Sequence, residues 1–307
     1  MSETEIGEAA DQLYKAVKNK DKEALTKITS QYPLTIRLKI RDKYKSSYGQ
    51  DLIEDFESKL SSDFKDLMIG LYTSIYEYDA DQCKKAIRRV GTDEDTLIEI
   101  IGTRPNWMLN KVKEIYKNKY NAQLEQDVID DTSGDFRKLL VSLLQCNRSE
   151  NKIPDKEKAM EMAKDLFKGD KDKGQIKVDE EKMNKYSASS SPVELMHLAR
   201  EFHREYGKSL IKVVEDQFSG DIRKLIKTIF YANISPSEYF ATRIREAVEG
   251  AGTNEKILNR VIITRNEVDM DIIKEYYKIL YSRDLIEDVK SDTSGVYRTL
   301  LVALIDK

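Results

Sequence analysis

One short stretch of the sequence carries residue types that suit a hard metal ion. Gly250 and Gly252 stand two residues apart, and the acid Asp292 follows forty residues after Gly252. Glycine lets the backbone take positive φ values and turn its carbonyl oxygens to one side. Calcium prefers about 6–8 oxygen ligands, and the carbonyls of Val248, Gly250 and Gly252 with a bidentate Asp292 would supply about five. The simpler interpretation of the same residues is a helix C-cap and a turn.

The pattern returns at regular shifts along the chain, which favours a functional interpretation. A shift of 72 residues places the first quarter of the sequence on the second, a shift of 161 places the second on the fourth, and a shift of 86 aligns the second with the third from its middle onward. The matching pairs include Gly91-Thr92 with Gly252-Thr253, Thr103-Arg104 with Thr264-Arg265, and Asp131–Gly134 with Asp292–Gly295. Such internal similarity predicts four units of about 70 residues, at 1–75, 76–148, 149–234 and 235–307.

Each unit is expected to contain five short helices, so the predicted fold class is all-α. The chain has 5 Pro and 13 Gly among 307 residues, and therefore few residues that break helices. In the second unit the helices are expected at 79–89, 93–102, 106–120, 121–130 and 134–144. The last of them has apolar residues at the spacing of a helix buried along one face. The polar linker Asn147–Asp155 is the expected hinge between a front and a back half, and Ser187–Pro192 is a second break.

The bulk properties exclude several classes of protein. The net charge is −3, and there is no basic cluster with interleaved aromatic residues, which argues against nucleic acid as a partner. The same charge argues against attraction to an anionic membrane leaflet without calcium. There is no apolar run of 18 residues, and the acidic start Met1–Glu5 does not resemble a signal peptide. Two cysteines, Cys83 and Cys146, form no disulfide framework, so a soluble cytosolic protein is expected.

With its four units, Gly-x-Gly-Thr turn, Thr-Arg pairs and Asp-x-Ser-Gly turns, nearly the whole chain resembles an annexin. The resemblance implies four five-helix repeats in a slightly curved disc with calcium loops on its convex face. It also implies calcium-dependent binding to acidic phospholipid membranes, with calcium (Ca²⁺) as the cofactor and no catalysis. The divergent turns also resemble the protozoan annexins called alpha-giardins.

The site residues that the resemblance implies differ between the units. In the fourth unit they are Val248, Gly250, Gly252 and Asp292, with Thr253 and Glu255 at a weaker neighbouring calcium position. In the second unit, which is expected to be weaker, they are Ile87, Arg89, Gly91 and Asp131.

Arg89 stands where the family has a glycine, and a cation there would repel calcium. The first unit has Lys59 in place of the acid, and the third unit has Gln217 there, so both of those sites are expected to be lost.

Other groups of residues have simpler interpretations. Asp170–Glu181 imitates an EF-hand loop, but its glycine comes one place early, so a solvated charged turn is favoured over a weak cation site. Asp79, Glu99, Arg104 and Arg260 match residues that line a central passage in annexins. Buried ion pairing is favoured there over an ion channel. Trp107 opens a helix and is expected to be a packing anchor.

Two functions are compatible with the sequence. The first is calcium-dependent peripheral membrane binding in the cytoplasm, at the plasma membrane. The alternative is a giardin-like scaffold on the cytoskeleton, the flagella or the membrane skeleton, with partners such as tubulin and with calcium secondary. The sequence does not predict the oligomeric state.

Overall fold

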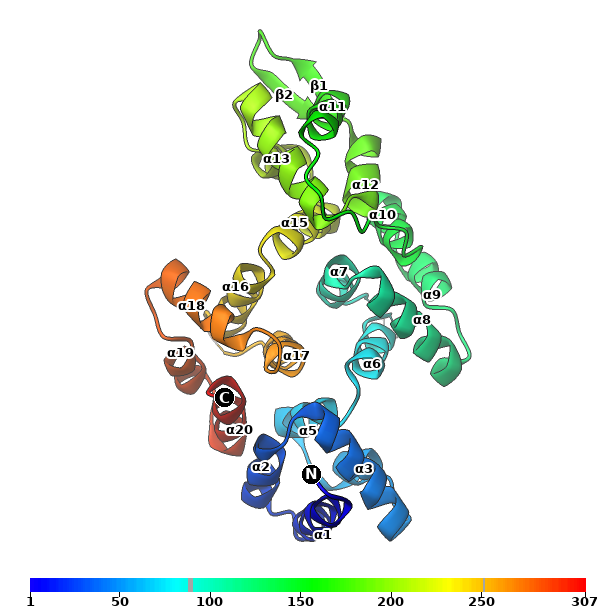
Figure 1. Ribbon diagram of the computed structural model, residues 1–307, viewed down its shortest axis with the longest axis vertical. Helices are drawn as coiled ribbons and strands as arrows, with labels where there is room; N and C mark the ends of the chain where they lie inside the picture. Colours follow the sequence, from blue (N-terminus) through cyan, green and yellow to red (C-terminus); the bar gives the residue numbers. More distant parts are fainter. Residues whose placement is uncertain (88–90, 251) are drawn as a thin grey trace. The chain divides into compact units, whose positions relative to one another are not determined.

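The computed structural model describes residues 1–87, 91–250 and 252–307. Within these residues are twenty α-helices and one two-stranded β-sheet. The helices form four repeats of five, α1–α5, α6–α10, α11–α15 and α16–α20, which confirms the all-α prediction (Figure 1). The chain divides into two compact units, residues 1–78 with 240–307 (unit 1) and residues 79–239 (unit 2).

The elements follow one another along the chain, repeat by repeat. Repeat 1 has α1 (Glu3–Asn19), α2 (Lys22–Gln31), α3 (Leu34–Tyr48), α4 (Leu52–Lys59) and α5 (Ser62–Leu71). Repeat 2 has α6 (Ile75–Ile87), α7 (Glu94–Thr103), α8 (Asn106–Tyr120), α9 (Leu124–Asp131) and α10 (Gly134–Leu144). Repeat 3 has α11 (Lys156–Leu166), β1 (Phe167–Asp170), β2 (Gln175–Val178), α12 (Glu180–Ser189), α13 (Pro192–Tyr206), α14 (Leu210–Gln217) and α15 (Gly220–Ile234). Repeat 4 has α16 (Pro236–Val248), α17 (Glu255–Arg265), α18 (Met270–Tyr281), α19 (Leu285–Asp292) and α20 (Gly295–Ile305).

The third helix of every repeat ends in the same way. Its C-cap residue lies in the left-handed region, at Gly49, Asn121, Gly207 and Ser282, with φ values of 67°, 50°, 68° and 54°. Glycine and asparagine adopt this conformation at little cost, so the helix stops here and the chain reverses. This reversal accounts for the later start of α9, at Leu124, where the sequence had suggested a helix from residue 121.

Unit 1 is built around helices from repeats 1 and 4. Helix α2 packs on α20, and α5 packs on α17. The second contact is close because Gly70 has no side chain: a Cβ atom there would lie 2.2 Å from Cδ1 of Ile263. A larger residue at position 70 would therefore force the two helices apart.

Unit 2 is built around helices from repeats 2 and 3. Helix α7 packs against α15, with Gly102 facing Leu225 and Thr228 across the contact. The Arg104 guanidinium donates to both carboxylate oxygens of Asp79, at 2.7 and 3.0 Å, and both side chains are buried. Buried ion pairing was the favoured interpretation of these two residues, and the pair joins α6 to the end of α7.

The expected hinge at Asn147–Asp155 is wrong. The boundaries between the two units fall at residues 78/79 and 239/240, so this linker lies inside unit 2. It is also tied down there. Arg148 donates to the side chain of Asn233 at 2.9 Å, and the amide of Ser149 donates to the carbonyl of Ser189 at 2.7 Å. Polar composition indicated a loop correctly, but it does not reveal the hydrogen bonds that hold a loop in place.

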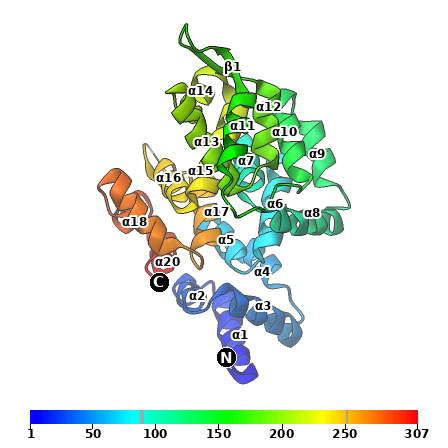
Figure 2. The same ribbon diagram turned by 45° about the horizontal axis from the view of Figure 1, so that its top comes forward.

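The EF-hand-like segment forms part of a β-hairpin, which the all-α prediction did not contain. Strands β1 and β2 pair antiparallel, from Phe167 opposite Val178 to Asp170 opposite Gln175, and project beyond α11 and α13 (Figures 1 and 2). Gly169 is required inside the hairpin, because a Cβ atom there would lie 2.1 Å from the carbonyl oxygen of Gln175. The carboxylate of Asp170 accepts hydrogen bonds from the turn that follows it, as expected of a solvated charged turn.

The expectation for Trp107 is also wrong. Its side chain is 57% exposed at the start of α8, so it does not anchor the core. The sequence around Trp107 is poor in glycine and favours a helix, which predicted the helix but not the direction in which the indole points.

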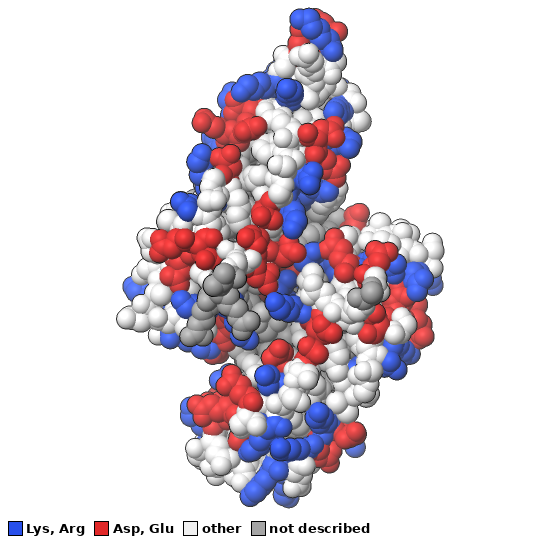
Figure 3. All heavy atoms as spheres, turned by 180° about the vertical axis from the view of Figure 1, so that it is seen from behind, with Lys and Arg blue, Asp and Glu red and all other residues white. Residues whose placement is uncertain are grey.

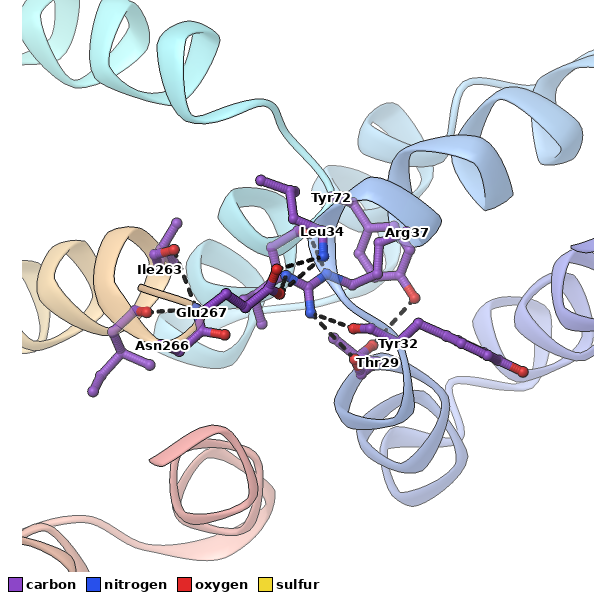
Figure 4. A network of polar contacts seen from close by, with 10 residues as sticks. Thr29, Tyr32, Leu34, Arg37, Tyr72, Ile263, Asn266 and Glu267 are labelled. Atoms are coloured by element: carbon purple, nitrogen blue, oxygen red, sulfur yellow. Dashed lines mark hydrogen bonds and ion pairs between the residues drawn. The ribbon is translucent and has the colours of Figure 1, made fainter. Parts of the chain in front are cut away.

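A buried arginine joins repeat 1 to repeat 4 inside unit 1. Arg37 on α3 is 1% exposed and donates to the carbonyls of Leu71 and Tyr32, at 2.7 and 2.8 Å. Its guanidinium also contacts the carboxylate of Glu267 at 3.1 Å (Figure 4). Glu267 accepts from the backbone amide of Leu34 as well, at 2.8 Å, so one carboxylate caps α3 and neutralises the buried charge.

Removing this carboxylate should destabilise unit 1. Glu267→Ala leaves a buried guanidinium without its counter-ion and an uncapped helix start, so we expect a loss of about 2–4 kcal/mol in the free energy of unfolding. The double variant Arg37→Met, Glu267→Ala should recover part of this loss, because the unpaired charge is then absent. Urea denaturation of the three proteins measures both effects. Equal midpoints for the parent and Glu267→Ala would contradict this account of the ion pair.

Candidate calcium-binding loops

The loop of repeat 4 connects α16 to α17. Val248 is the last residue of α16, Glu255 is the first of α17, and Ala251 lies outside the described residues. Gly250 and Gly252 have φ values of 114° and 90°, in a region that residues with a side chain rarely adopt. A hydrogen bond of 2.7 Å from the Asn254 amide to the carbonyl of Ala247 joins the two ends of the loop. The Asn254 side chain then accepts from the amide of Ile257 and so starts the next helix.

Asp292, at the end of α19, lies directly at this loop. The Thr253 hydroxyl donates to the Asp292 carbonyl at 2.7 Å and so fastens the helix end to the glycine turn. Among the described residues, Oδ2 of Asp292 is buried and has no hydrogen-bond partner. A buried carboxylate oxygen without a partner is unfavourable, and a cation would satisfy it. The donor set therefore fits calcium: glycine-loop carbonyls and one carboxylate, all of them hard oxygen ligands.

A second carboxylate holds α19 in place one turn earlier. Asp288 accepts from Arg245 at 3.0 Å and from the Tyr277 hydroxyl at 2.7 Å, which ties α19 to α16 and α18. Hydrogen bonds from Arg283 are the main reason why the pKa of Asp288 is lowered, with Tyr277 contributing in the same direction. Asp288 therefore stays ionised as an anchor, while Asp292 extends beyond it toward the loop.

The loop of repeat 2 has the same glycine turn and the same closing backbone hydrogen bond, with one difference at the aspartate. Gly91 has a φ value of 91°, and the Asp93 amide donates to the carbonyl of Ala86 at 3.0 Å. Here, however, the Thr92 hydroxyl lies within hydrogen-bond distance of the Asp131 carboxylate, at 2.7 Å, as well as of its carbonyl. The carboxylate that would bind calcium is thus already hydrogen-bonded. Ile87 is the last residue of α6, and Arg89 lies outside the described residues.

Repeat 1 has a different loop. Helix α1 continues to Asn19, and Lys20 alone turns the chain with a φ value of 55°. The backbone amides of Lys20 and Asp21 donate hydrogen bonds to the carbonyls of Val17 and Ala16. At the position of the acid, Lys59 forms an ion pair with Asp55 at 2.6 Å. An ammonium group and helical carbonyls in place of a carboxylate and open carbonyls do not suit a cation.

In repeat 3, the side-chain amide of Gln217 stands where repeats 2 and 4 have an aspartate. The amide of Val178, at the end of β2, donates to Oε1 of Gln217 at 2.9 Å, and Nε2 of Gln217 donates to the Val178 carbonyl at 2.8 Å. Gln217 is the last residue of α14, where repeats 2 and 4 have their aspartates. A neutral side chain therefore links helix end and loop directly, without a metal.

Comparison with known proteins assigns the family. The annexin family model matches four segments, residues 8–71, 78–143, 161–229 and 239–304. The chain belongs to the annexin family.

Annexin A13 of Mus musculus is 41% identical over 298 residues, which cover 96% of this chain and 93% of that protein. The solved structure of annexin III has a TM-score of 0.93 and 30% identity, and covers 98% of this chain and 94% of that one. Calcium-bound annexin (Sm)1 is also similar, with a TM-score of 0.85 at 28% identity and coverage of 98% and 90%. Annexins as a family bind calcium and membranes and are generally not enzymes.

The resemblance to giardins extends to the fold alone. Calcium-bound alpha-14 giardin has a TM-score of 0.82 but only 21% identity, over 97% of this chain and 99% of that one. At this identity a similar course of the backbone says nothing about partners.

Sequence reasoning missed an arginine near each of the two candidate calcium ligands of this annexin, Asp292 and Asp131. Arg298 donates from Nε to the carbonyl of Thr293 at 2.6 Å, and Arg137 donates to the carbonyl of Thr132 in the same way. Each guanidinium fixes the residue that follows the candidate ligand. The two arginines are related by the shift of 161 residues, so the repeat alignment contained a signal that could have identified them.

Two absences concern only the described part of the chain. The structure there shows no group of three or more His, Cys, Asp or Glu side chains that could hold a metal. In the same residues, no helix combines the length and the apolar character needed to cross a bilayer.

We expect calcium to stabilise this annexin mainly through repeat 4. In Asp292→Ala the calcium-dependent rise in melting temperature should be largely lost, because Asp292 supplies the charged ligand of the main site, beside the carbonyls of Val248, Gly250 and Gly252. Asp131→Ala should lose less, because the Asp131 carboxylate is already hydrogen-bonded by Thr92. Without calcium, Asp292→Ala should be no less stable than the parent, since it removes an oxygen without a partner. Calorimetric titration and thermal melts with and without calcium measure these effects. A parent-like response from Asp292→Ala would place the main site elsewhere.

Gln217 should act as a metal-independent link in repeat 3. Gln217→Ala removes both hydrogen bonds to Val178, at a cost of about 1 kcal/mol each, so the Val178 amide should exchange with solvent at least about tenfold faster. Calcium binding should be unchanged. Hydrogen exchange detected by NMR or mass spectrometry tests this, with Gln126→Ala on the exposed face of α9 as control. Unchanged exchange at Val178 would show that β2 is held by other contacts.

Proposed function

We propose that this annexin binds acidic phospholipid membranes in a calcium-dependent manner, chiefly through repeat 4. One observation carries the proposal: among the described residues, the buried Oδ2 of Asp292 has no hydrogen-bond partner, and the main chain of Asp292 is bonded to Thr253 of the glycine turn. The carbonyls of Val248, Gly250 and Gly252 and the carboxylate of Asp292 would hold the ion. Bound calcium would supply the positive charge that attracts a lipid phosphate.

The surface charge supports a role for calcium in this attraction. Lys and Arg side chains are interspersed with Asp and Glu on the face shown in Figure 3, and the net charge of the chain is −3. A mixed surface of this kind gives little attraction to an anionic leaflet by itself. A bound divalent cation at the loop would change the local charge from negative to positive.

Thr253 and Glu255 support a weaker neighbouring calcium position in the same proposal. Glu255 is the first residue of α17 and half-buried, and Thr253 already donates to the Asp292 carbonyl. Repeat 2 would contribute a second, weaker loop through Ile87, Gly91 and Asp131. Repeats 1 and 3 would contribute none. Binding through one complete loop favours low calcium affinity.

The alternative is a scaffold on the cytoskeleton, with tubulin as one candidate partner. The giardin likeness shows the fold only, so repeat 4 gives the membrane proposal the stronger support. Peripheral attachment to the plasma membrane from the cytoplasmic side is part of the same proposal.

Calcium titration of vesicle binding tests the proposal. The chain should sediment with phosphatidylserine vesicles at about 10⁻⁴–10⁻³ M calcium, in the range of weak calcium modules, and be released by a chelator. Phosphatidylcholine vesicles and polymerised tubulin serve as the comparison arms, and Lys59→Ala as the control variant with unchanged binding. Half-binding near micromolar calcium would mean that further loops bind well. Sedimentation with tubulin but not with vesicles would favour the scaffold.

A further inference from the structure

The two threonines that follow the glycine turns of repeats 2 and 4 make different hydrogen bonds. The Thr92 hydroxyl lies 2.7 Å from the carboxylate oxygen Oδ2 of Asp131 and 3.0 Å from the Asp131 carbonyl oxygen. The Thr253 hydroxyl donates to the Asp292 carbonyl oxygen at 2.7 Å, and Oδ2 of Asp292 has no hydrogen-bond partner among the described residues. The same residue types therefore leave one carboxylate bonded and the other open.

The backbone around the two aspartates does not account for this difference. Thr132 and Thr293 cap α9 and α19 in the same way, each with its hydroxyl donating to the carbonyl four residues earlier, at 2.5 and 2.6 Å. Gly91 and Gly252, which precede the two threonines, have φ values of 91° and 90°. The helix ends and the turns are thus alike, and the acceptor of one hydroxyl proton distinguishes the two loops.

A threonine hydroxyl has a single proton to donate. The Thr92 proton can therefore be directed fully at the carboxylate or at the carbonyl of Asp131, but not at both. Thr92 directly follows Gly91, so its proton approaches the carboxylate from the glycine turn. A cation held by the carbonyls of that turn would approach from the same side, where the partly positive proton opposes it.

We propose that the Thr92 hydroxyl lowers the calcium affinity of repeat 2 and so makes this loop weaker than the loop of repeat 4. Without calcium the hydroxyl donates to the carboxylate of Asp131. With calcium it turns to the Asp131 carbonyl, which is the bond that Thr253 already makes to Asp292. The Asp131 carbonyl lies only 3.0 Å away, so rotation of the hydroxyl is sufficient. This role rests on the proposed function, in which calcium is the ion of both loops.

The same substitution should act differently in the two loops. Thr92→Val removes a hydrogen bond to a carboxylate from the calcium-free loop, and only a weaker one to a carbonyl from the calcium-bound loop. Repeat 2 should therefore bind calcium about fivefold more tightly. Thr253→Val removes a bond to a main-chain carbonyl, which does not compete for the carboxylate, and loosens the link between α19 and the turn. Repeat 4 should therefore bind calcium no more tightly than in the parent.

Calcium titration of the full chain, followed by NMR, measures each loop separately. The backbone amides of Gly91 and Gly252 report on repeats 2 and 4. In Thr92→Val the midpoint at Gly91 should fall to about a fifth of the parent value, while the midpoint at Gly252 stays unchanged. Thr92→Ser keeps the hydroxyl and should behave like the parent. Circular dichroism confirms that each variant is folded.

A parent-like or higher midpoint at Gly91 in Thr92→Val would overturn the proposal. A gain of the same size at Gly252 in Thr253→Val would also overturn it, because the effect would then not depend on the bond to the carboxylate. A Gly91 signal that responds to calcium in neither the parent nor Thr92→Val would do the same, since another residue would then limit repeat 2.

Vesicle sedimentation tests the proposed function separately, because the titration contains no lipid. Calcium-dependent sedimentation of the parent, together with an unchanged Gly91 midpoint in Thr92→Val, would leave the proposed function standing and reject the role of Thr92.

Discussion

The candidate calcium site depends on a hydrogen bond between two segments that lie 39 residues apart. The Thr253 hydroxyl donates to the carbonyl of Asp292 and brings the end of α19 to the glycine turn. Helix α19 is independently held by Asp288, through Arg245 and Tyr277. The carboxylate is therefore positioned before any ion arrives. A preformed site loses little conformational entropy on binding, which offsets part of the affinity lost through having few charged ligands.

The four repeats share this frame and differ in the group that closes it. In repeat 2 a threonine hydroxyl bonds to the carboxylate, and in repeat 3 the amide of Gln217 bonds to the loop in both directions. Repeat 1 has no open loop, because α1 continues through it. The helices that build the core are conserved in position while the loop chemistry changes, so fold and site must be argued separately.

The fold could be predicted from the sequence because it repeats and because its helices bury regular apolar stripes, as in α10. Gly250, Gly252 and Asp292 were identified for the same reason, although their role as calcium ligands stays a prediction. The hairpin was missed because Gly169 and Gly174 interrupt a segment with no periodic pattern. The hinge was misplaced because nothing local in Asn147–Asp155 reveals the contacts of Arg148 and Ser149. Long-range hydrogen bonds, such as that of Arg37 with Glu267, leave no trace in local composition.

A crystal structure determined after soaking in calcium would show directly whether repeat 4 holds the main calcium site. We expect calcium at the loop of repeat 4, bound by the carboxylate of Asp292 and by carbonyls of the glycine turn, with weaker occupancy at Asp131. We expect none beside Lys59 or Gln217. An empty loop at Asp292, with calcium at the hairpin of repeat 3 or at repeat 1, would contradict this expectation.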